Sequence, residues 1–383
     1  MARIVYALSG QGRGHASRVL AITDALRRRG HDVVFCCGGM AREIMESVGE
    51  HVIPVPALRQ VIEDNEVRLF RTIRCNLGSI LRLRQIVRRL ADEFRRLGPD
   101  LLITDFEAFA PRAARQLGIP ILSFNHQEVV TELVYDLPDR HRRNAALTSY
   151  AIRLIVPRNP THILLTSFFF GPLRRPESTT LIPPIIRPEV QALTPTPGEH
   201  VLVYFNQTEG AEGVIESLSA VDASFILYNF EPPDDPERYP NLTFKSPSID
   251  EFVDDLAGCR AVICTAGFTL ISESLYLGKP LLVVPNRGIF EQTINALFLQ
   301  RDGLGAAVIE RPLTAFDVQQ FISNIELYRA RMAGRDVLGN DQAVQCIEQL
   351  LARKTPSRNG LQEQPSEAVR PGLAAGSYVA KAE

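Results

Sequence analysis

The residues best suited to chemistry follow a short apolar segment that ends at Cys264. Gly267 precedes a helical pattern, so free backbone N–H groups at the start of that helix could receive a phosphate. Glu273, further along the same helix, carries a carboxylate that could accept hydrogen bonds from two neighbouring hydroxyl groups. Glu291 and Gln292 open the next predicted helix and could contact further hydroxyls. This order of residues predicts a site for a phosphorylated ligand that is rich in hydroxyl groups.

Backbone groups around Gly267 form the predicted phosphate cradle. Its members are Ala266, Gly267, Phe268 and Thr269, the last of which adds a hydroxyl. Asn206 and Gln207 follow another apolar segment, and their side-chain amides could also donate to phosphate. Simpler interpretations remain open for the carboxylates. The helix macrodipole alone favours a carboxylate such as that of Glu273 in the first half of a helix. It also favours a glutamate near the start of a helix, where Glu291 lies.

The amino-terminal loop SGQGRGH is the second candidate region. Its glycines lack the G-x-G-x-x-G spacing, so a nicotinamide or flavin dinucleotide is not indicated. His15 stands where the loop becomes a helix, and its imidazole could accept a proton from a hydroxyl near neutral pH. The alternative is a histidine that merely caps the helix.

Polar residues also follow two later strands of this half. Asp105 could hold the second ring nitrogen of His15, with Glu107 as a competitor and a plain turn role as the alternative. His126 could bind an acceptor or a pyrophosphate, or it could serve only the hydrogen bonding of its loop.

Alternating strands and helices position these residues. The first series of predicted strands is 3–8, 32–37, 51–55, 101–104, 121–124 and, as the last of this half, 163–167. The second series is 201–205, 224–228, 242–245, 261–264 and 281–284. Long helices are predicted over 67–97, with a break at Gly78, and over 315–333. The pattern predicts an α/β fold of two Rossmann-like domains facing a central cleft.

The domain boundaries follow from composition. We predict a first domain over 1–178, a proline-rich linker over 179–200 and a second domain over 201–353. Residues 354–383 are rich in Ser, Pro, Gly, Gln and Ala without a core pattern, which predicts a disordered tail.

Charge and cysteine content indicate which partners and which cellular compartment to expect. A formal net charge of −2 over 383 residues gives no global field for nucleic acid. Nine arginines in 68–96 face only Asp92 and Glu93, which indicates either solvated helix faces or attraction to an anionic acceptor or lipid surface. Six cysteines form no C-x-x-C set, and from this sequence we expect neither a secretion signal nor a membrane-spanning helix. We expect a cytoplasmic protein, with peripheral contact at the inner face of the cytoplasmic membrane as a further hypothesis.

The segment 264–305 resembles the donor half of GT-B glycosyltransferases, particularly the lipid II-forming UDP-N-acetylglucosamine transferases. The Gly267-to-Glu273 spacing and the element Gln292, Asn295 and Ala296 carry the resemblance. The resemblance covers about residues 1–350 and implies an acceptor-binding first domain and a donor-binding second domain. It implies donor contacts from Gly12, Asn206, Gln207, Ala266, Gly267, Phe268, Thr269, Glu273, Glu291, Gln292 and Asn295, and acceptor contacts from Arg13 and His126.

The resemblance also implies a reaction. An inverting transferase would move a sugar from a nucleoside diphosphate, expected to be UDP, to an acceptor hydroxyl that His15 deprotonates with Asp105 as its orienting carboxylate. A lipid-linked or polysaccharide acceptor would suit the arginine-rich helices. We expect no cofactor and no required metal, because no D-x-D pair follows a strand and GT-B enzymes stabilise the leaving diphosphate with a helix dipole. A GT-B-fold UDP-sugar 2-epimerase and a catalytically silent nucleotide-sugar-binding subunit remain as alternatives.

Overall fold

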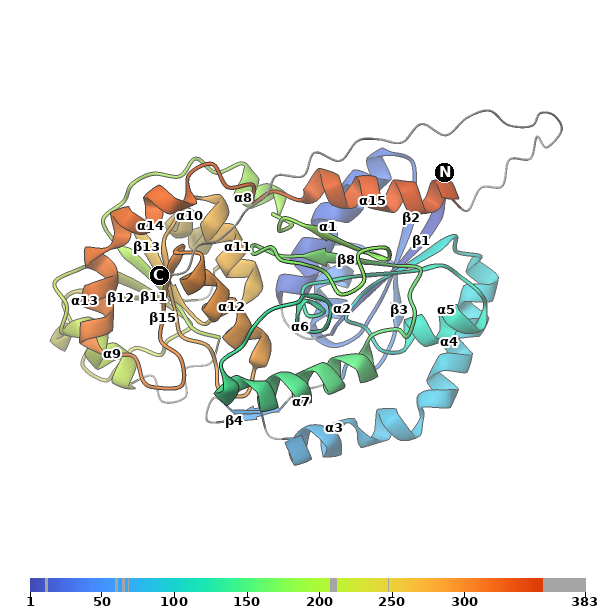
Figure 1. Ribbon diagram of the computed structural model, residues 1–383, viewed down its shortest axis with the longest axis horizontal. Helices are drawn as coiled ribbons and strands as arrows, with labels where there is room; N and C mark the ends of the chain where they lie inside the picture. Colours follow the sequence, from blue (N-terminus) through green and yellow to red (C-terminus); the bar gives the residue numbers. More distant parts are fainter. Residues whose placement is uncertain are drawn as a thin grey trace.

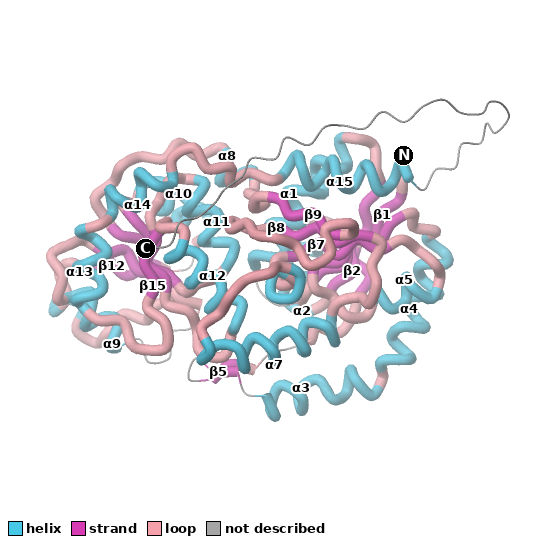
Figure 2. Tube along the Cα trace, in the orientation of Figure 1, coloured by secondary structure: helices cyan, strands magenta, loops and turns pink. Residues whose placement is uncertain are grey.

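The chain folds into two parallel sheets wrapped by helices, which are shown as ribbons in Figure 1 and as two separate groups of strands in Figure 2. The computed structural model describes residues 1–10, 13–58, 61–63, 66–67, 69–206, 212–246 and 248–353. The predicted tail over 354–383 lies outside these residues. The fold is α/β with two Rossmann-like units, as the alternation of elements predicted.

The first sheet has seven strands in the order β3-β2-β1-β6-β7-β8-β9. Their bounds are β1 Arg3–Leu8, β2 Asp32–Cys37, β3 Val52–Pro54, β6 Leu101–Asp105, β7 Ile121–Asn125, β8 His162–Thr166 and β9 Thr179–Ile182. All neighbours in it pair in parallel. The central strands β1, β6, β7 and β8 are largely apolar and buried, as expected for a parallel sheet covered on both faces. Two short strands outside this sheet, β4 Ile62–Glu63 and β5 Glu66–Val67, pair in antiparallel fashion.

Helices cover both faces of this sheet. The helices of this half of the chain are α1 Arg13–Arg28, α2 Gly39–Ser47, α3 Leu69–Leu81, α4 Leu83–Leu97, α5 Ala110–Gln116, α6 Val129–Glu132 and α7 Asp139–Ile155, of which α3 lies away from the sheet and contacts α4. Successive residues of β1 point to opposite faces: Ile4 joins the core with α1, and Val5 joins the core with α4 and α5. Within α4 the buried residues Val87, Leu90, Ala91 and Phe94 recur at helical spacing, so one face of the helix packs on the sheet.

The second sheet has six strands in the order β12-β11-β10-β13-β14-β15. Their bounds are β10 Val201–Tyr204, β11 Phe225–Tyr228, β12 Leu242–Lys245, β13 Ala261–Cys264, β14 Leu281–Val283 and β15 Gly305–Ala307. The accompanying helices are α8 Pro188–Gln191, α9 Glu212–Ser219, the 3-10 turn η1 Pro236–Arg238, α10 Ile249–Gly258, α11 Phe268–Tyr276, α12 Phe290–Arg301, α13 Ala315–Ser323, α14 Ile325–Met332 and α15 Asn340–Arg353.

Both sheets reverse their winding once, and these reversals locate the functional edge. In the first sheet the order reverses between β1 and β6, and in the second between β10 and β13. Loops that leave the carboxyl ends of strands on either side of such a reversal diverge and leave a crevice for a ligand. The predicted site residues Asp105, Asn206 and Gly267 all lie at these ends.

Several predicted elements are wrong in detail. The strand 163–167 is not the last of its half, because β9 follows it and pairs with β8. Strand β9 lies within the region predicted to be a linker. The break in the first long helix lies at Arg82, whereas Gly78 lies within α3. The helix predicted over 315–333 ends at Asn324 and restarts as α14. Helices α6 and α7 were not predicted.

The last helix returns to the first half of the molecule. Helix α15 packs beside α1, and Ala343, Val344 and Ile347 join the core of the first sheet (Figure 1). The predicted second domain, 201–353, therefore includes a helix whose apolar face is buried in the other half. The two segments that cross between the halves are hydrogen-bonded to each other, since Ile186 N donates to Asn340 Oδ1 at 3.0 Å and Asn340 Nδ2 donates to Ile186 O at 2.8 Å.

Candidate active site

The loops after β10 and β13 meet at the reversal of the second sheet. These strands are hydrogen-bonded neighbours, and they carry Asn206 and Gly267 just beyond their carboxyl ends. A methyl group added to Gly267 would have the Asn206 amide nitrogen, at 3.9 Å, as its nearest contact. Gly267 itself has an ordinary φ of −71°, so its backbone conformation does not require glycine. What glycine provides here is an open surface beside the start of α11.

The start of α11 lacks the groups that usually cap a helix. Gly267 offers no side-chain cap, and the first turn contains no acidic residue. Helix α13 differs, because Thr314 and Asp317 form a complete capping box there. The first N–H groups of α11 have no partner within the helix, and its dipole places positive charge at this end. Phe268 and Thr269 therefore present the features of an anion-binding terminus.

Glu273 is paired with an arginine from outside its own helix. The guanidinium of Arg187, the residue before α8, donates from Nε to Glu273 Oε1 at 2.8 Å and from Nη2 to Oε2 at 3.1 Å. Both side chains are largely buried, with 16% of the arginine and 5% of the glutamate exposed. Burial raises the pKa of Glu273, and Arg187 opposes that rise. Each carboxylate oxygen of Glu273 has a second lone pair, so these oxygens can still accept hydrogen bonds from ligand hydroxyls.

The predicted sugar-contacting residues lie around the start of α12. Gln292 is buried, and its Oε1 accepts a hydrogen bond from the backbone N–H of Asn286 at 2.8 Å, which fixes the preceding loop. Glu291 is half-buried at the first turn of the helix. Asn295 is fully buried and donates to Ala266 O at 3.1 Å, so α12 is tied to the loop before α11.

His126 connects the two halves of the molecule. Its ring stacks on Phe268 with centroids 3.8 Å apart and an interplanar angle of 8°. Its nitrogens lie 2.8 Å from Thr166 O and 2.8 Å from Asn295 Oδ1. Burial lowers the pKa of His126 to about 4, with the hydrogen bonds to Thr166 and Asn295 opposing that shift. In this arrangement His126 joins β7 to α11 and α12, and both ring nitrogens are occupied by protein groups.

Asp105 is bound to an arginine that the sequence interpretation overlooked. Arg18 Nη2 donates to Asp105 Oδ2 at 2.6 Å, and both residues are buried. The Arg18 guanidinium also lies 5.9 Å from the centre of the Phe268 ring in the other half. His15 lies in the first turn of α1, one helical turn before Arg18, and its side chain is outside the described part of the structure.

For three further predicted site residues, the structure does not describe the side chain. Gly12 and Gln207 lie outside the described residues. Arg13 begins α1, and its side chain is not described either. Arg18 and Arg187 are the additions that the structure makes to the predicted set. For Arg18 a signal existed in the sequence, because it follows His15 by three residues in a helical pattern and therefore shares its face.

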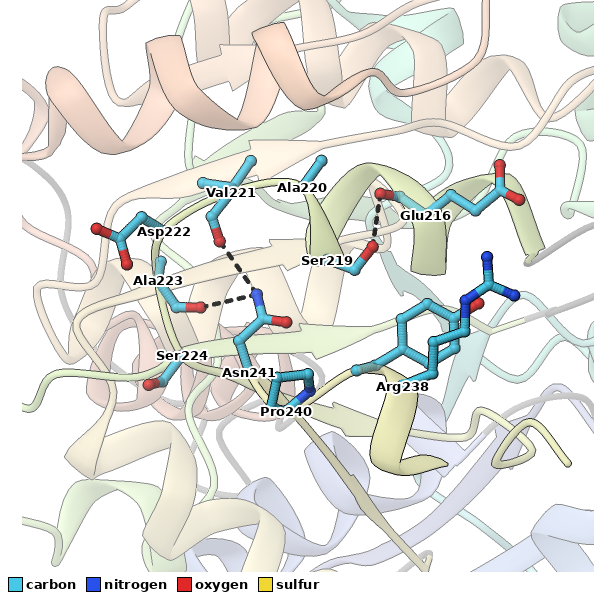
Figure 3. A pocket seen from close by; sticks show the side chains of 11 residues that line it. Glu216, Ser219, Ala220, Val221, Asp222, Ala223, Ser224, Arg238, Pro240 and Asn241 are labelled. Carbon is cyan, nitrogen blue, oxygen red and sulfur yellow. Dashed lines mark hydrogen bonds between the residues drawn. The ribbon is translucent and has the colours of Figure 1, made fainter. Parts of the chain in front are cut away.

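A surface hollow of about 620 Å³ lies elsewhere, at the opposite ends of the strands in the second sheet (Figure 3). It is lined by the segments that precede β11 and β12. Asn241, at its centre, already donates to backbone oxygens of Val221 at 3.0 Å and Ala223 at 3.2 Å. Ligands of such folds bind beyond the carboxyl ends of the strands, so we assign this hollow no role in the site.

Among the described residues, no group of three or more His, Cys, Asp or Glu side chains could hold a metal ion. None of the helices in the described part of the chain is both long and apolar enough to cross a membrane.

Comparisons with known proteins agree with this architecture. A sequence model described as "Glycosyl transferase family 1" matches residues 2–326. An uncharacterized glycosyltransferase of Methanosarcina mazei is 24% identical over 335 residues, which cover 79% of this chain and 84% of the relative. A UDP-N-acetylglucosamine–N-acetylmuramyl-(pentapeptide) pyrophosphoryl-undecaprenol N-acetylglucosamine transferase of Anaeromyxobacter sp. (strain K) is 32% identical over 139 residues, 32% of this chain and 36% of that protein. The crystal structure of the glycotransferase of kitacinnamycin shares the fold, with a TM-score of 0.65 and 18% identity over 91% of this chain and 98% of that one.

Proposed function

The chain belongs to glycosyl transferase family 1, and we propose that it is an inverting enzyme that moves a sugar from UDP to an acceptor hydroxyl. The observation that carries the proposal is the geometry at the reversal of the second sheet. The uncapped start of α11 suits a diphosphate, and Glu273 lies further along the same helix, where it suits the ribose hydroxyls. The Anaeromyxobacter relative is named for a UDP-N-acetylglucosamine donor, which supports UDP as the nucleotide.

In this reaction the second half of the molecule binds the donor and the first half activates the acceptor. The donor binds the second half, with its diphosphate at Gly267, Phe268 and Thr269 and its sugar near Gln292. His15, at the start of α1, takes the proton of the acceptor hydroxyl as that oxygen attacks the anomeric carbon. The bond from the anomeric carbon to the diphosphate breaks, and the charge that develops falls on N–H groups already in place. Attack from the face opposite the leaving group inverts the anomeric centre.

Nucleotide binding is the first test. Thermal unfolding of the full chain is measured with UDP, dTDP and GDP, for the wild type and for Glu273→Gln, which keeps the shape of the side chain. A ligand at about 100 times its Kd adds about 2.7 kcal/mol to the stability of the protein that binds it. We expect stabilisation by UDP that is weaker in Glu273→Gln. The absence of stabilisation by all three nucleotides would contradict the proposal.

Turnover tests the proposed base. Release of UDP from UDP-sugars is followed in the presence of a panel of hydroxyl acceptors. We expect His15→Ala to bind UDP like the wild type and to lose transfer by about 100- to 10,000-fold, the usual contribution of a general base. Unchanged transfer by His15→Ala would remove this residue from the mechanism.

We also propose that the enzyme contacts a membrane surface through α3 and α7, both of which lie along the lower edge of Figure 1. Large apolar side chains are exposed on these helices: Ile73, Leu77, Ile80, Leu81, Leu147, Tyr150 and Leu154. Exposed arginines accompany them, among them Arg74, Arg82, Arg142 and Arg143. Apolar side chains flanked by arginines favour an anionic lipid surface, which supports a lipid-linked acceptor.

Vesicle sedimentation tests the membrane contact. Each buried leucine contributes about 1.5–3 kcal/mol, so the double substitution Leu77→Glu and Leu81→Glu is expected to reduce binding to phosphatidylglycerol vesicles by at least about tenfold. Phe316→Glu is the matched control, because Phe316 is also an exposed apolar residue but lies on α13. Equal binding by the double variant and the wild type would refute the contact.

A further inference from the structure

A buried guanidinium from the first half of the molecule lies near the side chain that begins α11. Helix α11 begins at Phe268 with neither a side-chain cap nor an acidic residue in its first turn. The guanidinium of Arg18, which belongs to α1, lies 5.9 Å from the centre of the Phe268 ring. Donors of a guanidinium and the positive end of a helix both favour an anion. A diphosphate held at the start of α11, as proposed above, would therefore lie near the Arg18 guanidinium.

Arg18 is built into the fold in a way that an ordinary surface arginine is not. Its side chain is 5% exposed, and Nη2 donates to Asp105 Oδ2 at 2.6 Å. Asp105 is fully buried at the carboxyl end of β6, beside the reversal of the first sheet. The carboxylate fixes the guanidinium in place and balances its single charge.

We propose that Arg18 binds the diphosphate of the donor from the side opposite to α11, and that Asp105 is the positioning residue that holds it there. This inference rests on the proposed function. When the bond between the anomeric carbon and the diphosphate oxygen breaks, the leaving group gains one negative charge while the acceptor proton passes to the base. Arg18 and the α11 N–H groups then share that charge, which requires no metal ion. The acceptor half would thus complete the donor site only when the two halves are together.

A purely structural ion pair is the competing explanation, and the two roles predict different ligand behaviour. If Arg18 contacts the diphosphate, its loss weakens UDP binding but leaves uridine binding unchanged, because uridine carries no phosphate. If Arg18 only supports the fold, its loss affects both ligands equally or affects neither. The ratio of the two affinities therefore separates the roles, whereas thermal stability alone does not.

The matched control lies on the same helix. Arg27 is also paired with a carboxylate, that of Glu50, with Nη2 2.6 Å from Oε2, and it also lies over a phenylalanine ring, that of Phe35, at 5.7 Å. It stands in the last turn of α1, at the end opposite the site. Arg27→Met therefore removes the same kinds of contact but leaves the Arg18 guanidinium near the start of α11.

Isothermal titration of the full chain with UDP and with uridine compares the wild type, Arg18→Met, Arg18→Lys and Arg27→Met. A hydrogen bond to a charged group contributes enough that Arg18→Met is expected to weaken UDP binding by about 10- to 100-fold, with uridine binding unchanged. Arg18→Lys keeps the charge and serves if Arg18→Met does not fold; it is expected to restore part of the UDP affinity. Arg27→Met is expected to bind both ligands like the wild type.

Two other results have distinct meanings. Equal changes for UDP and uridine in the Arg18 variants, or no change in either, would overturn the role of Arg18 and leave the proposed function standing. A wild-type protein that binds uridine as tightly as UDP would overturn the diphosphate site and, with it, both proposals.

Discussion

Replacing Arg187 by methionine tests how the structure holds the carboxylate of Glu273. The substitution keeps an apolar side chain of similar length and removes both donors of the bidentate pair. Glu273 then remains buried, with 5% of its side chain exposed, but without its arginine. Removing one partner of a buried ion pair leaves an uncompensated charge, and the cost is about 3–5 kcal/mol. We expect a loss of stability of that order for Arg187→Met.

The pH dependence of this loss identifies its cause. Burial already raises the pKa of Glu273 and Arg187 opposes the rise, so removing Arg187 raises the pKa further. A carboxyl group whose pKa is higher in the folded than in the unfolded chain binds more protons when folded. Its contribution to stability is present at low pH and is lost as the pH rises through the folded pKa. The penalty in Arg187→Met should therefore increase from about pH 4.5 upward.

Urea unfolding measured at several pH values by circular dichroism is the assay, because the chain has no tryptophan to report by fluorescence. Arg311→Met is the control: Arg311 also forms a bidentate pair, with Asp317, but is half-exposed, so its loss should cost about 0–1 kcal/mol. The double variant Arg187→Met, Glu273→Met should recover part of the loss, because it removes the stranded charge. A penalty below about 1 kcal/mol in Arg187→Met, or one that is independent of pH, would refute the reasoning.

Two further predictions concern stability. A methyl group on Gly305 would lie 2.1 Å from the backbone oxygen of Leu281 on the neighbouring strand, so Gly305→Ala should destabilise the protein by about 1–3 kcal/mol in urea unfolding. Gly213, in α9, has open space at the same position, so Gly213→Ala should instead stabilise it by about 0.5–1 kcal/mol; a loss in both or in neither would contradict the packing. His126 has a folded pKa of about 4, below the value of 6.5 for an unperturbed histidine, so the unfolded chain takes up its proton first and stability falls as pH falls from about 6.5 to 4. Glu107, with a pKa of about 7, changes the stability in the opposite direction, so the effect of His126 is taken as the difference in stability between the wild type and His126→Gln. This difference should change by about 3 kcal/mol between pH 6.5 and pH 4. No change would mean that the histidine is solvated.

The fold could be predicted from the sequence because its strands are short apolar runs that alternate with helices. That alternation also placed Asp105, Asn206 and Gly267 at the carboxyl ends of strands, where the structure has them. Helix α6 has only four residues, too few to show a helical period, and all four are buried. Helix α7 is largely exposed and its apolar residues show little periodicity, so the pattern did not predict it. Low helix propensity favours a break at Gly78, but Gly78 is tolerated within α3 and the helix breaks at Arg82.

The pairs that complete the candidate site could not be predicted from spacing. Arg187 and Glu273 are 86 residues apart, and His126 and Asn295 are 169 residues apart. Each pair joins a side chain from the first half or its crossing segment to one in the second half. Such contacts depend on how two independently wound sheets dock, and local patterns of apolar residues do not encode that docking.

The return of α15 to the first sheet affects the order in which the protein can form. Ribosomes release a chain from its amino end, and domains generally fold as they emerge. The first sheet and its helices α1 to α7 emerge early, but the apolar face of α1 that receives α15 stays uncovered until Asn340–Arg353 has been synthesised. The second sheet, whose core draws on residues up to Ile325 and Tyr328, emerges complete before then. The half that is made first is therefore finished last, and a chain truncated before residue 340 would expose that face of α1 to other nascent proteins and to chaperones.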